Sequence, residues 1–403
     1  MPLSRIAAGL LVTAALANAV ECSPRVLSPH VADTYSAKAF ARFAGWRDLT
    51  DDAKVYAVYA YLADPRTGIF PSGMPAIENG ESMDEHAAIT DPIKMLNVYP
   101  IGHCATLGPT VEGLFRDMGL GRTNTLYLPG ASHVVAEVEI GDHWAYIDLD
   151  LRAVFRRADG TLASMEDAQR DASLWAGPHG PLFFWHGGLE NTRTGYAATS
   201  IDRRYGFNQG GHTMDVALRQ GETLTRWWQP QGGRWNHHPS YGERPFPRNK
   251  LDEAPAGPKC KHTGFSVHAH GNGRFDYAPD LTDASSDVAD GAHLLDGVAP
   301  AADGLRGAGH ALFRLRTPWV IAPLVGDPDT PDDDREAAVI TIDAVGTTLA
   351  LSLDEGLTWR ELGSAHGVHD LTAHVRGTYG YLLRLTLAGD AAVVRTMSST
   401  TWV

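Results

Sequence analysis

Residues 102–150 decide the fold of this chain and read GHCATLGPTVEGLFRDMGLGRTNTLYLPGASHVVAEVEIGDHWAYIDLD. Apolar side chains recur in the first part of the stretch at the spacing of an amphipathic helix. They are Leu107, Val111, Leu114, Phe115 and Met118. Gly119 and Gly121 follow and are typical of a helix end. The sequence therefore predicts a helix that starts near Cys104 and ends at Met118.

The remainder, residues 123–150, has the pattern of a short strand followed by a β-hairpin. Gly141-Asp142 is suited to a two-residue turn, which would place His133 opposite Asp150. Residues that share a face of a strand repeat at every second position. His133, Asp148 and Asp150 are therefore predicted to project to the same side of the hairpin.

This arrangement has the chemistry of a thiol enzyme. A thiol needs a base to become a thiolate, and the base needs a carboxylate to fix its tautomer. A helix N-terminus favours the thiolate further. Gly102-x-Cys104, His133 at the start of a strand and Trp144-x-x-x-Asp148 on the next strand resemble the transglutaminase-like superfamily of papain-like enzymes over about residues 95–155. The resemblance implies Cys104 as nucleophile, His133 as base and Asp148 as the orienting carboxylate.

Three neighbouring residues are alternatives for these roles. Asp150 is the alternative carboxylate, and Asp148 is preferred for its spacing from Trp144. His143 is an alternative base, but it is predicted to lie on the opposite face of its strand. His103 is adjacent to the nucleophile and could instead shape the pocket, as could Asp150 and Trp144.

Pro109 does not fit a helix that begins at Cys104, because proline lacks an amide donor. Either the helix begins a few residues later, or its first turn is irregular. The non-catalytic alternative is that Cys104 is a buried apolar cysteine, as cysteines often are.

The composition is that of a globular protein, with 403 residues, 43% hydrophobic and 20% charged. The formal net charge of −14 argues against nucleic acid as a partner. Residues 1–19 have the order of a secretory signal peptide: Arg5, an apolar run too short to span a bilayer, and Ala17-Asn18-Ala19. We expect a periplasmic or secreted protein with no membrane insertion after cleavage.

Cys22, Cys104 and Cys260 would remain after cleavage, and an odd number of cysteines suggests one reactive thiol. If Cys22 pairs with Cys260, Cys104 is that thiol. The sequence does not establish this pairing.

Residues 20–190 are assigned to the transglutaminase-like core with an N-terminal helical segment. Thr50 is the expected cap of a helix whose first turn is acidic, and Asp64-Pro65 ends it. Residues 66–93 are predicted to be a long loop over the cleft. A helix is expected over 165–175.

Residues 191–282 are predicted to be rich in β-strands and contain many Trp and His residues. Trp228, Trp235, His237 and His238 have the composition of a flat-ligand or sugar-stacking surface, or of a joint between domains. His268 and His270 would share a strand face, but no third ligand has a recognisable spacing, so no metal site is assigned.

Residues 283–309 are mostly small or polar and are predicted to be a linker, followed by a β-sandwich over 310–403. Within it, residues 352–359 (SLDEGLTW) resemble an Asp-box, a hairpin turn closed by Ser, Asp and Gly with Trp behind it. The motif occurs once, so a propeller is not expected.

The sequence thus predicts an exported α+β protein: a transglutaminase-like core, a β-rich region and a C-terminal β-sandwich. The favoured function is hydrolysis or transfer of an amide or acyl group by a Cys-His-Asp triad without a cofactor. A polysaccharide lyase or glycan hydrolase that reuses the fold is the alternative, and a non-catalytic binding module is a third hypothesis. The expected substrate is a peptide, another amide-linked molecule or a glycan.

Overall fold

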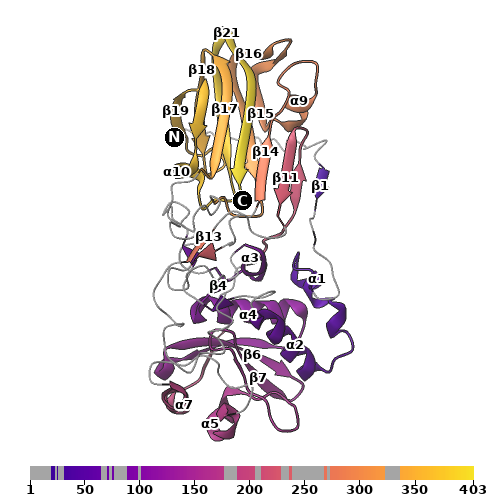
Figure 1. Cartoon of the computed structure of the whole chain (residues 1–403), viewed down its shortest axis with the longest axis vertical. Coiled ribbons are helices and arrows are strands. Elements are labelled where there is room, and N and C mark those ends of the chain that lie inside the picture. Colours follow the sequence, from indigo (N-terminus) through magenta and orange to yellow (C-terminus); the bar gives the residue numbers. More distant parts are fainter. Residues whose placement is uncertain are drawn as a thin grey trace, which may run out of the picture.

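The computed structural model describes residues 20–22, 25, 31–64, 70–71, 75–76, 89–98, 101–176, 188–204, 210–227, 236–237, 267–269, 273–322 and 336–403. The protein is α+β, as predicted. Figure 1 shows two bodies stacked along the longest axis: a mixed helix and sheet body from the N-terminal half, and a β-rich body that ends with the C-terminus.

The N-terminal body is built on a five-stranded antiparallel sheet in the order β8-β7-β6-β5-β9. Its strands are β5 (Thr123–Leu128), β6 (His133–Ile140), β7 (His143–Asp148), β8 (Ala153–Val154) and β9 (Asp202–Arg204). Ile140 pairs with His143 across Gly141-Asp142, so the predicted two-residue turn and its register are confirmed.

Seven helices accompany this sheet within the described residues. They are α1 (Ala37–Ala41), α2 (Asp51–Ala63), α3 (Pro92–Asn97), α4 (Cys104–Met118), α5 (Met165–Arg170), α6 (Ser173–Ala176) and α7 (Gly188–Ala198). Thr50 caps α2 as predicted. The single helix expected over 165–175 is two short helices, and α7 was not predicted.

The helices cover both faces of the sheet. Apolar residues of α2 and α4 form one core with the face of β6 that carries Ala136, Val138 and Ile140. Apolar residues of α5, α6 and α7 form a second core with Val135 and Tyr146 on the other face. The amphipathic stripe seen in the sequence is thus the face of α4 that packs on the sheet. Figure 1 shows α4 lying along the sheet beside β6.

Short strand pairs lie around these bodies. β1 (Val20–Cys22) pairs with β10 (Val216–Leu218), and β2 (Phe70–Pro71) pairs with β4 (Ile101–Gly102) just before α4. β12 (Asn236–His237), β13 (Val267–Ala269) and β3 (Pro75–Ala76) form a three-stranded sheet.

The C-terminal body is one nine-stranded sheet whose strand pairs are all antiparallel. Its strands are β11 (Glu222–Arg226), β14 (Gly273–Tyr277), β15 (Leu294–Ala301), β16 (Gly304–Arg316), β17 (Ala338–Val345), β18 (Thr347–Ser352), β19 (Arg360–Ser364), β20 (Gly367–Asp370) and β21 (Gly380–Trp402). The helices α9 (Asp287–Gly291) and α10 (Thr372–Val375) flank it. The first part of β21 pairs with β16 and β18, and its last part with β17 and β14, so one strand connects the whole body.

The predicted linker at 283–309 is wrong. These residues contain α9, all of β15 and the first half of β16. Glycine is needed where the two strands meet: Gly307 has φ of +130°, and a Cβ on it would lie 2.2 Å from the carbonyl oxygen of Gly297. The small residues that suggested a flexible linker are required by close strand packing.

The boundaries predicted around residues 191–282 also change. β9 belongs to the N-terminal sheet, whereas β11 and β14 belong to the C-terminal one. The described strands of this region therefore belong to several sheets, in which β11 pairs with β14 and β12 with β13, and the C-terminal sheet begins well before residue 310.

The turn at 352–359 has the geometry expected of it. Ser352 Oγ lies 2.8 Å from Asp354 Oδ1, and the Thr358 amide donates to the same oxygen at 2.8 Å. The Gly356 amide donates to Ser352 Oγ at 2.9 Å, and the Trp359 ring lies against Gly356. The motif closes the β18–β19 hairpin.

The helix α3 joins the two bodies. Asp91 caps it by accepting from the amides of Ile93 and Lys94. Ile93 packs into the core of the C-terminal body, whereas Met95 packs into the core beneath α4. The Lys94 ammonium lies 4.8 Å from the ring centre of Tyr379. The segment before Cys104 is therefore held by both bodies.

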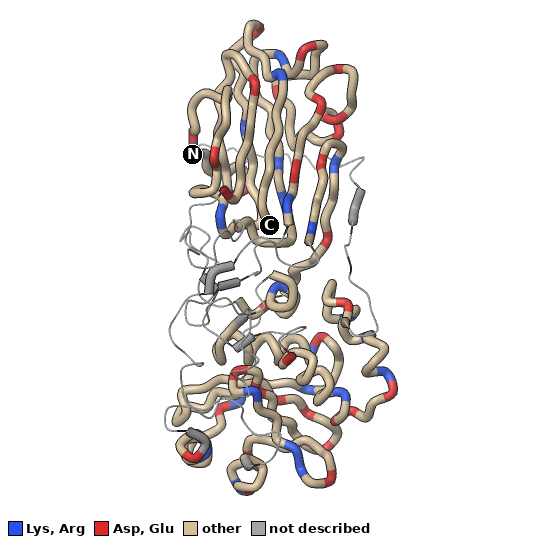
Figure 2. The backbone as a smooth tube through the Cα atoms, viewed as in Figure 1, with Lys and Arg blue, Asp and Glu red and all other residues tan. Residues whose placement is uncertain are grey.

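Several predictions fall outside the described residues. These are the signal peptide, Cys260, Trp228, Trp235, His238 and His270, and for Cys22, His237 and His268 the side chains are not described. Within the described part of the chain, no helix is long and apolar enough to cross a membrane. Figure 2 shows acidic and basic residues interspersed along both bodies.

Candidate active site

Cys104 is the first residue of α4, and the turn that holds it is regular. His103 is the N-cap: its Nδ1 accepts from the Ala105 amide at 3.0 Å, and its own amide donates to Thr106 Oγ1 at 3.1 Å. The amides of Thr106 and Leu107 both donate to the His103 carbonyl. The irregular first turn expected because of Pro109 is not found, since these bonds close the turn ahead of the proline.

Glycine lets α4 approach the sheet closely. A Cβ on Gly108 would lie 3.1 Å from both the backbone nitrogen of Val135 and Cγ1 of Val134. The helix therefore crosses β6 directly beside the residue that follows His133. This contact fixes the distance between Cys104 and the start of β6, where His133 lies.

His133 and Asp148 meet in the interior. The two side chains are 0% and 1% exposed, and His133 Nε2 lies 2.9 Å from Asp148 Oδ2. The Tyr146 hydroxyl donates to the same carboxylate oxygen at 2.8 Å, and the Leu151 amide donates to Oδ1 at 2.8 Å. Three donors point at the Asp148 carboxylate, which is the arrangement that suits a carboxylate without a proton. Nε2 of His133 therefore carries the proton in the hydrogen bond to Asp148.

Asp150 lies on the Nδ1 side of the imidazole, and Cys104 lies close to the ring. One sulfur, one ring nitrogen and one carboxylate oxygen of Cys104, His133 and Asp150 all lie within 4.8 Å of one another. His133 Nδ1 is 3.8 Å from Asp150 Oδ2. Because Nε2 is engaged by Asp148, Nδ1 is the nitrogen that can take a proton from the Cys104 thiol. Cys104 forms no disulfide, and the residue is 9% exposed.

A buried arginine balances the two aspartates. Arg152 is 2% exposed, has φ of +55° and donates to the Leu62 carbonyl at 3.3 Å. Burial lowers the pKa of Arg152 to about 10, while Tyr59 and the carboxylates of Asp150 and Asp148 act against this. The guanidinium therefore stays charged at neutral pH. Burial also raises the pKa of Tyr59 and of Tyr146, so both phenols are neutral hydrogen-bonding groups.

The structure shows where each alternative site residue lies. His143 bonds to Asp52 of α2 at 3.0 Å and so is not at the site. Trp144 was a predicted pocket residue but lies at the far end of β7, where Arg122 and Arg203 contact its ring. His103 lies next to Cys104 and caps its helix.

The sequence prediction missed three residues around the imidazole. Tyr146 lies two positions before Asp148 on one strand face, so the period of the strand could have revealed it. The ring centre of Tyr196 in α7 is 5.8 Å from that of His133. No sequence signal places Tyr196 or Arg152 there, because arginine is seldom buried and α7 is distant in the chain.

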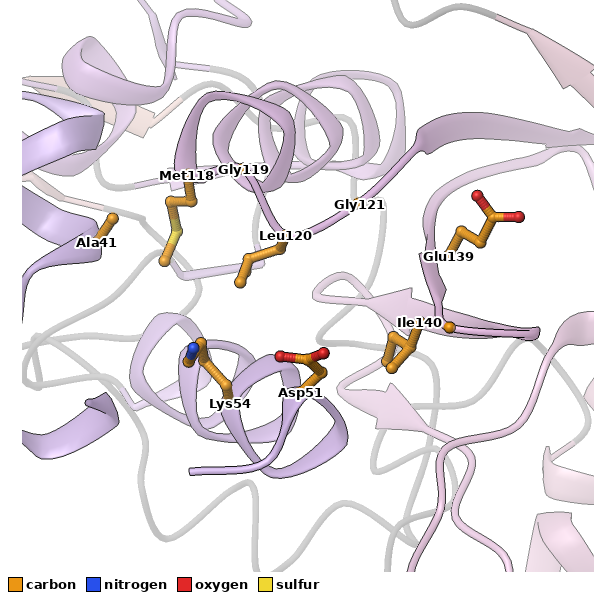
Figure 3. Close-up of a pocket in the computed structure, with 10 residues that line it drawn as sticks. Ala41, Asp51, Lys54, Met118, Gly119, Leu120, Gly121, Glu139 and Ile140 are labelled. Carbon is orange, nitrogen blue, oxygen red and sulfur yellow. The ribbon is translucent and has the colours of Figure 1, made fainter. Parts of the chain in front are cut away.

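A separate pocket of about 360 Å³ lies at the other end of α4, beside Met118, Gly119 and Leu120. Figure 3 shows Asp51 and Lys54 of α2 on its opposite side. The helix has 15 residues, so this pocket is about 20 Å from Cys104. It is not part of the thiol site.

No family model, curated protein or solved structure matches this chain. What the site can do is therefore argued from its own geometry. That geometry offers a thiol at a helix start, an imidazole with one nitrogen directed away from its buried carboxylate, and a second carboxylate beside them.

Proposed function

We propose that the protein is a cysteine-dependent enzyme that cleaves or transfers an amide or related acyl group. The observation that carries the proposal is the set of groups at the site: Cys104 with a ring nitrogen of His133 within 4.8 Å, and Asp148 bonded to Nε2 of that ring at 2.9 Å. This is the nucleophile, base and orienter arrangement of a catalytic triad. The transglutaminase-like resemblance of residues 95–155 assigns the same roles to the same residues.

The chemistry follows from these contacts. His133 takes the thiol proton at Nδ1, and the Cys104 sulfur attacks the carbonyl carbon to give a tetrahedral intermediate. The dipole of α4, whose positive end lies at Cys104, would stabilise the oxyanion. His133 then returns the proton to the leaving amine, which departs and leaves a thioester on Cys104.

Asp148 acts through His133. It holds the Nε2–H tautomer and stabilises the imidazolium that forms when the thiol is ionised. Tyr146 and the Leu151 amide fix the carboxylate in turn. Water resolves the thioester in a hydrolase and an amine resolves it in a transferase. We favour water, and in this proposal the substrate is met after export.

The test needs no knowledge of the natural substrate. Native protein is incubated with p-nitrophenyl acetate, the acylated peptide is located by mass spectrometry, and thioester character is checked by release with hydroxylamine. We expect rapid acylation at Cys104 that is lost in Cys104→Ala and His133→Ala and retained in Cys260→Ser. Acylation at another residue, or at equal rates with and without His133, would overturn the proposal.

Adding a primary amine to the same reaction distinguishes the two outcomes of the thioester. Formation of the free acid alone supports hydrolysis, and formation of the N-acetylated amine supports transfer.

A further inference from the structure

Asp150 is not needed by the triad, yet it lies beside both reacting groups. Its side chain is 4% exposed, and Oδ2 is 3.8 Å from His133 Nδ1. With Cys104 and His133 it forms a set of three different donor types, S, N and O, whose atoms lie within 4.8 Å of one another. A thiolate, an imidazole and a carboxylate are the ligand types that zinc takes in proteins.

One of the three donor separations already suits a bound metal ion. Zinc bonds of about 2.0–2.3 Å in a tetrahedral site place neighbouring donor atoms between three and four ångströms apart. The separation of 3.8 Å between His133 Nδ1 and Asp150 Oδ2 falls in this range. Three protein ligands would leave a fourth position for water.

The surroundings of His133 are also those of a metal ligand. A ligating histidine almost always donates its other ring N–H to a carboxylate or carbonyl, which fixes the ring. Asp148 receives that bond from Nε2 at 2.9 Å, inside the protein. Nδ1 is thereby directed toward Asp150, and Cys104 lies beside the same ring.

The local charge favours a divalent cation. An ionised Cys104 and the carboxylates of Asp148 and Asp150 are three anionic groups, and among the described residues the buried Arg152 lies near the two carboxylates. An excess of negative charge in a buried group is costly. One divalent cation neutralises it.

We infer that Cys104, His133 and Asp150 form a site for Zn²⁺, and that bound Zn²⁺ prevents the thiol from reacting. Binding replaces the thiol proton, which is released to solvent, and places the metal on the sulfur and on the nitrogen that would act as base. The zinc-bound form is therefore inactive in acyl transfer. The metal site itself does not depend on the proposed function, although its inhibitory effect does.

The first test is protection of the thiol. Metal-free native protein is treated with iodoacetamide with and without one equivalent of Zn²⁺, and the carbamidomethylated cysteines are located by mass spectrometry. We expect Zn²⁺ to slow modification of Cys104, and added chelator to restore it. Modification of Cys104 that is unchanged by saturating Zn²⁺ would overturn the inference, even if zinc binds elsewhere, for example at the histidine-rich stretch.

The second test separates the ligands from their neighbours by competition with a chromophoric chelator. Asp148→Asn should weaken Zn²⁺ binding about 10- to 100-fold, the usual effect of a residue that orients a ligand. Asp150→Asn should weaken it more, whereas Asp142→Asn, at the exposed turn of the same hairpin, should not change it. Equal affinity of the Asp150→Asn and Asp142→Asn proteins would also overturn the inference.

The experiments distinguish a failure of the metal-site inference from a failure of the proposed function. If zinc fails to protect Cys104 but acylation still requires His133, the metal site is wrong and the triad stands. If zinc protects Cys104 but no acylation occurs there without metal, the metal site stands and the enzyme proposal fails.

Discussion

Replacing Asp148 by asparagine separates the catalytic role of this residue from its structural role. The carboxylate accepts from His133 Nε2, the Tyr146 hydroxyl and the Leu151 amide. Asparagine keeps one acceptor oxygen, which can stay on Leu151, and turns an NH₂ group toward the other two donors. His133 can then carry its proton on Nδ1 instead of Nε2. In that tautomer Nδ1 can no longer accept the proton of the Cys104 thiol.

The two effects differ greatly in size. The wrong tautomer in a catalytic triad costs about 10⁴-fold in rate. The Tyr146 hydroxyl, by contrast, loses one buried partner, which costs about 1–3 kcal/mol of unfolding free energy. We therefore expect a folded protein with acylation of Cys104 reduced by orders of magnitude.

The assay is the acylation rate with p-nitrophenyl acetate beside urea denaturation of the same samples. Asp142→Asn is the matched control, because its side chain is fully exposed at the turn of the same hairpin. The reasoning is refuted if Asp148→Asn acylates within about tenfold of wild type, or about 1.4 kcal/mol in activation free energy. A more damaging Asp150→Asn change would assign the orienting role to that residue instead.

Three further predictions concern individual side chains in both bodies. Gly108→Val should cost about 1–3 kcal/mol in urea denaturation and slow acylation, because its side chain meets β6. Gly195→Ala has open space around it inside α7 and should neither destabilise the fold nor slow acylation; equal losses in the two variants would refute the close approach. Burial raises the pKa of Glu137 to about 7 although Arg203 opposes this, so its contribution to stability falls as pH rises from 4.5 to 7. The unfolding free energy of wild type relative to Glu137→Gln should therefore drop by about 3 kcal/mol over that range, and a constant difference would contradict it. Asp354→Ala should speed amide exchange in the β18–β19 hairpin alone, since Asp354 bonds to both ends of that turn, and unchanged exchange there would count against this role.

The central part of the fold could be predicted because local chemistry and tertiary packing agree there. The apolar stripe of α4 is buried on the sheet, and Gly119 takes the left-handed conformation (φ +74°) that ends the helix. Gly141, with φ of +60°, makes the hairpin turn on which the register depends. From that register, the common face of His133 and Asp148 followed directly.

The sequence was misleading where residues have uncommon roles. The glycines of β15 and β16 resemble a linker in composition, but they allow backbone contacts that a Cβ would block. The strand β21 continues through Gly389-Asp390 with a shift in register, although a glycine followed by an aspartate is typical of a turn.

The rule that alternate residues of a strand share a face does not identify the side-chain partners at the site. That rule puts both Asp148 and Asp150 on the side of His133, and only the distances assign Nε2 to one and Nδ1 to the other. The pattern also gives no reason to place Arg152 in the interior, because its burial depends on two carboxylates that meet only in the folded chain.

The pH dependence of alkylation at Cys104 tests the central claim most directly. Metal-free native protein and the His133→Ala variant are treated with iodoacetamide across a pH series, and the modified Cys104 peptide is quantified at each point. An ordinary thiol ionises near pH 8.5. We predict that wild-type Cys104 already reacts rapidly at about pH 6 and that His133→Ala returns it to the ordinary profile. If both proteins follow the same profile with a midpoint near pH 8.5, Cys104 is not activated by His133 and the account of the site is contradicted.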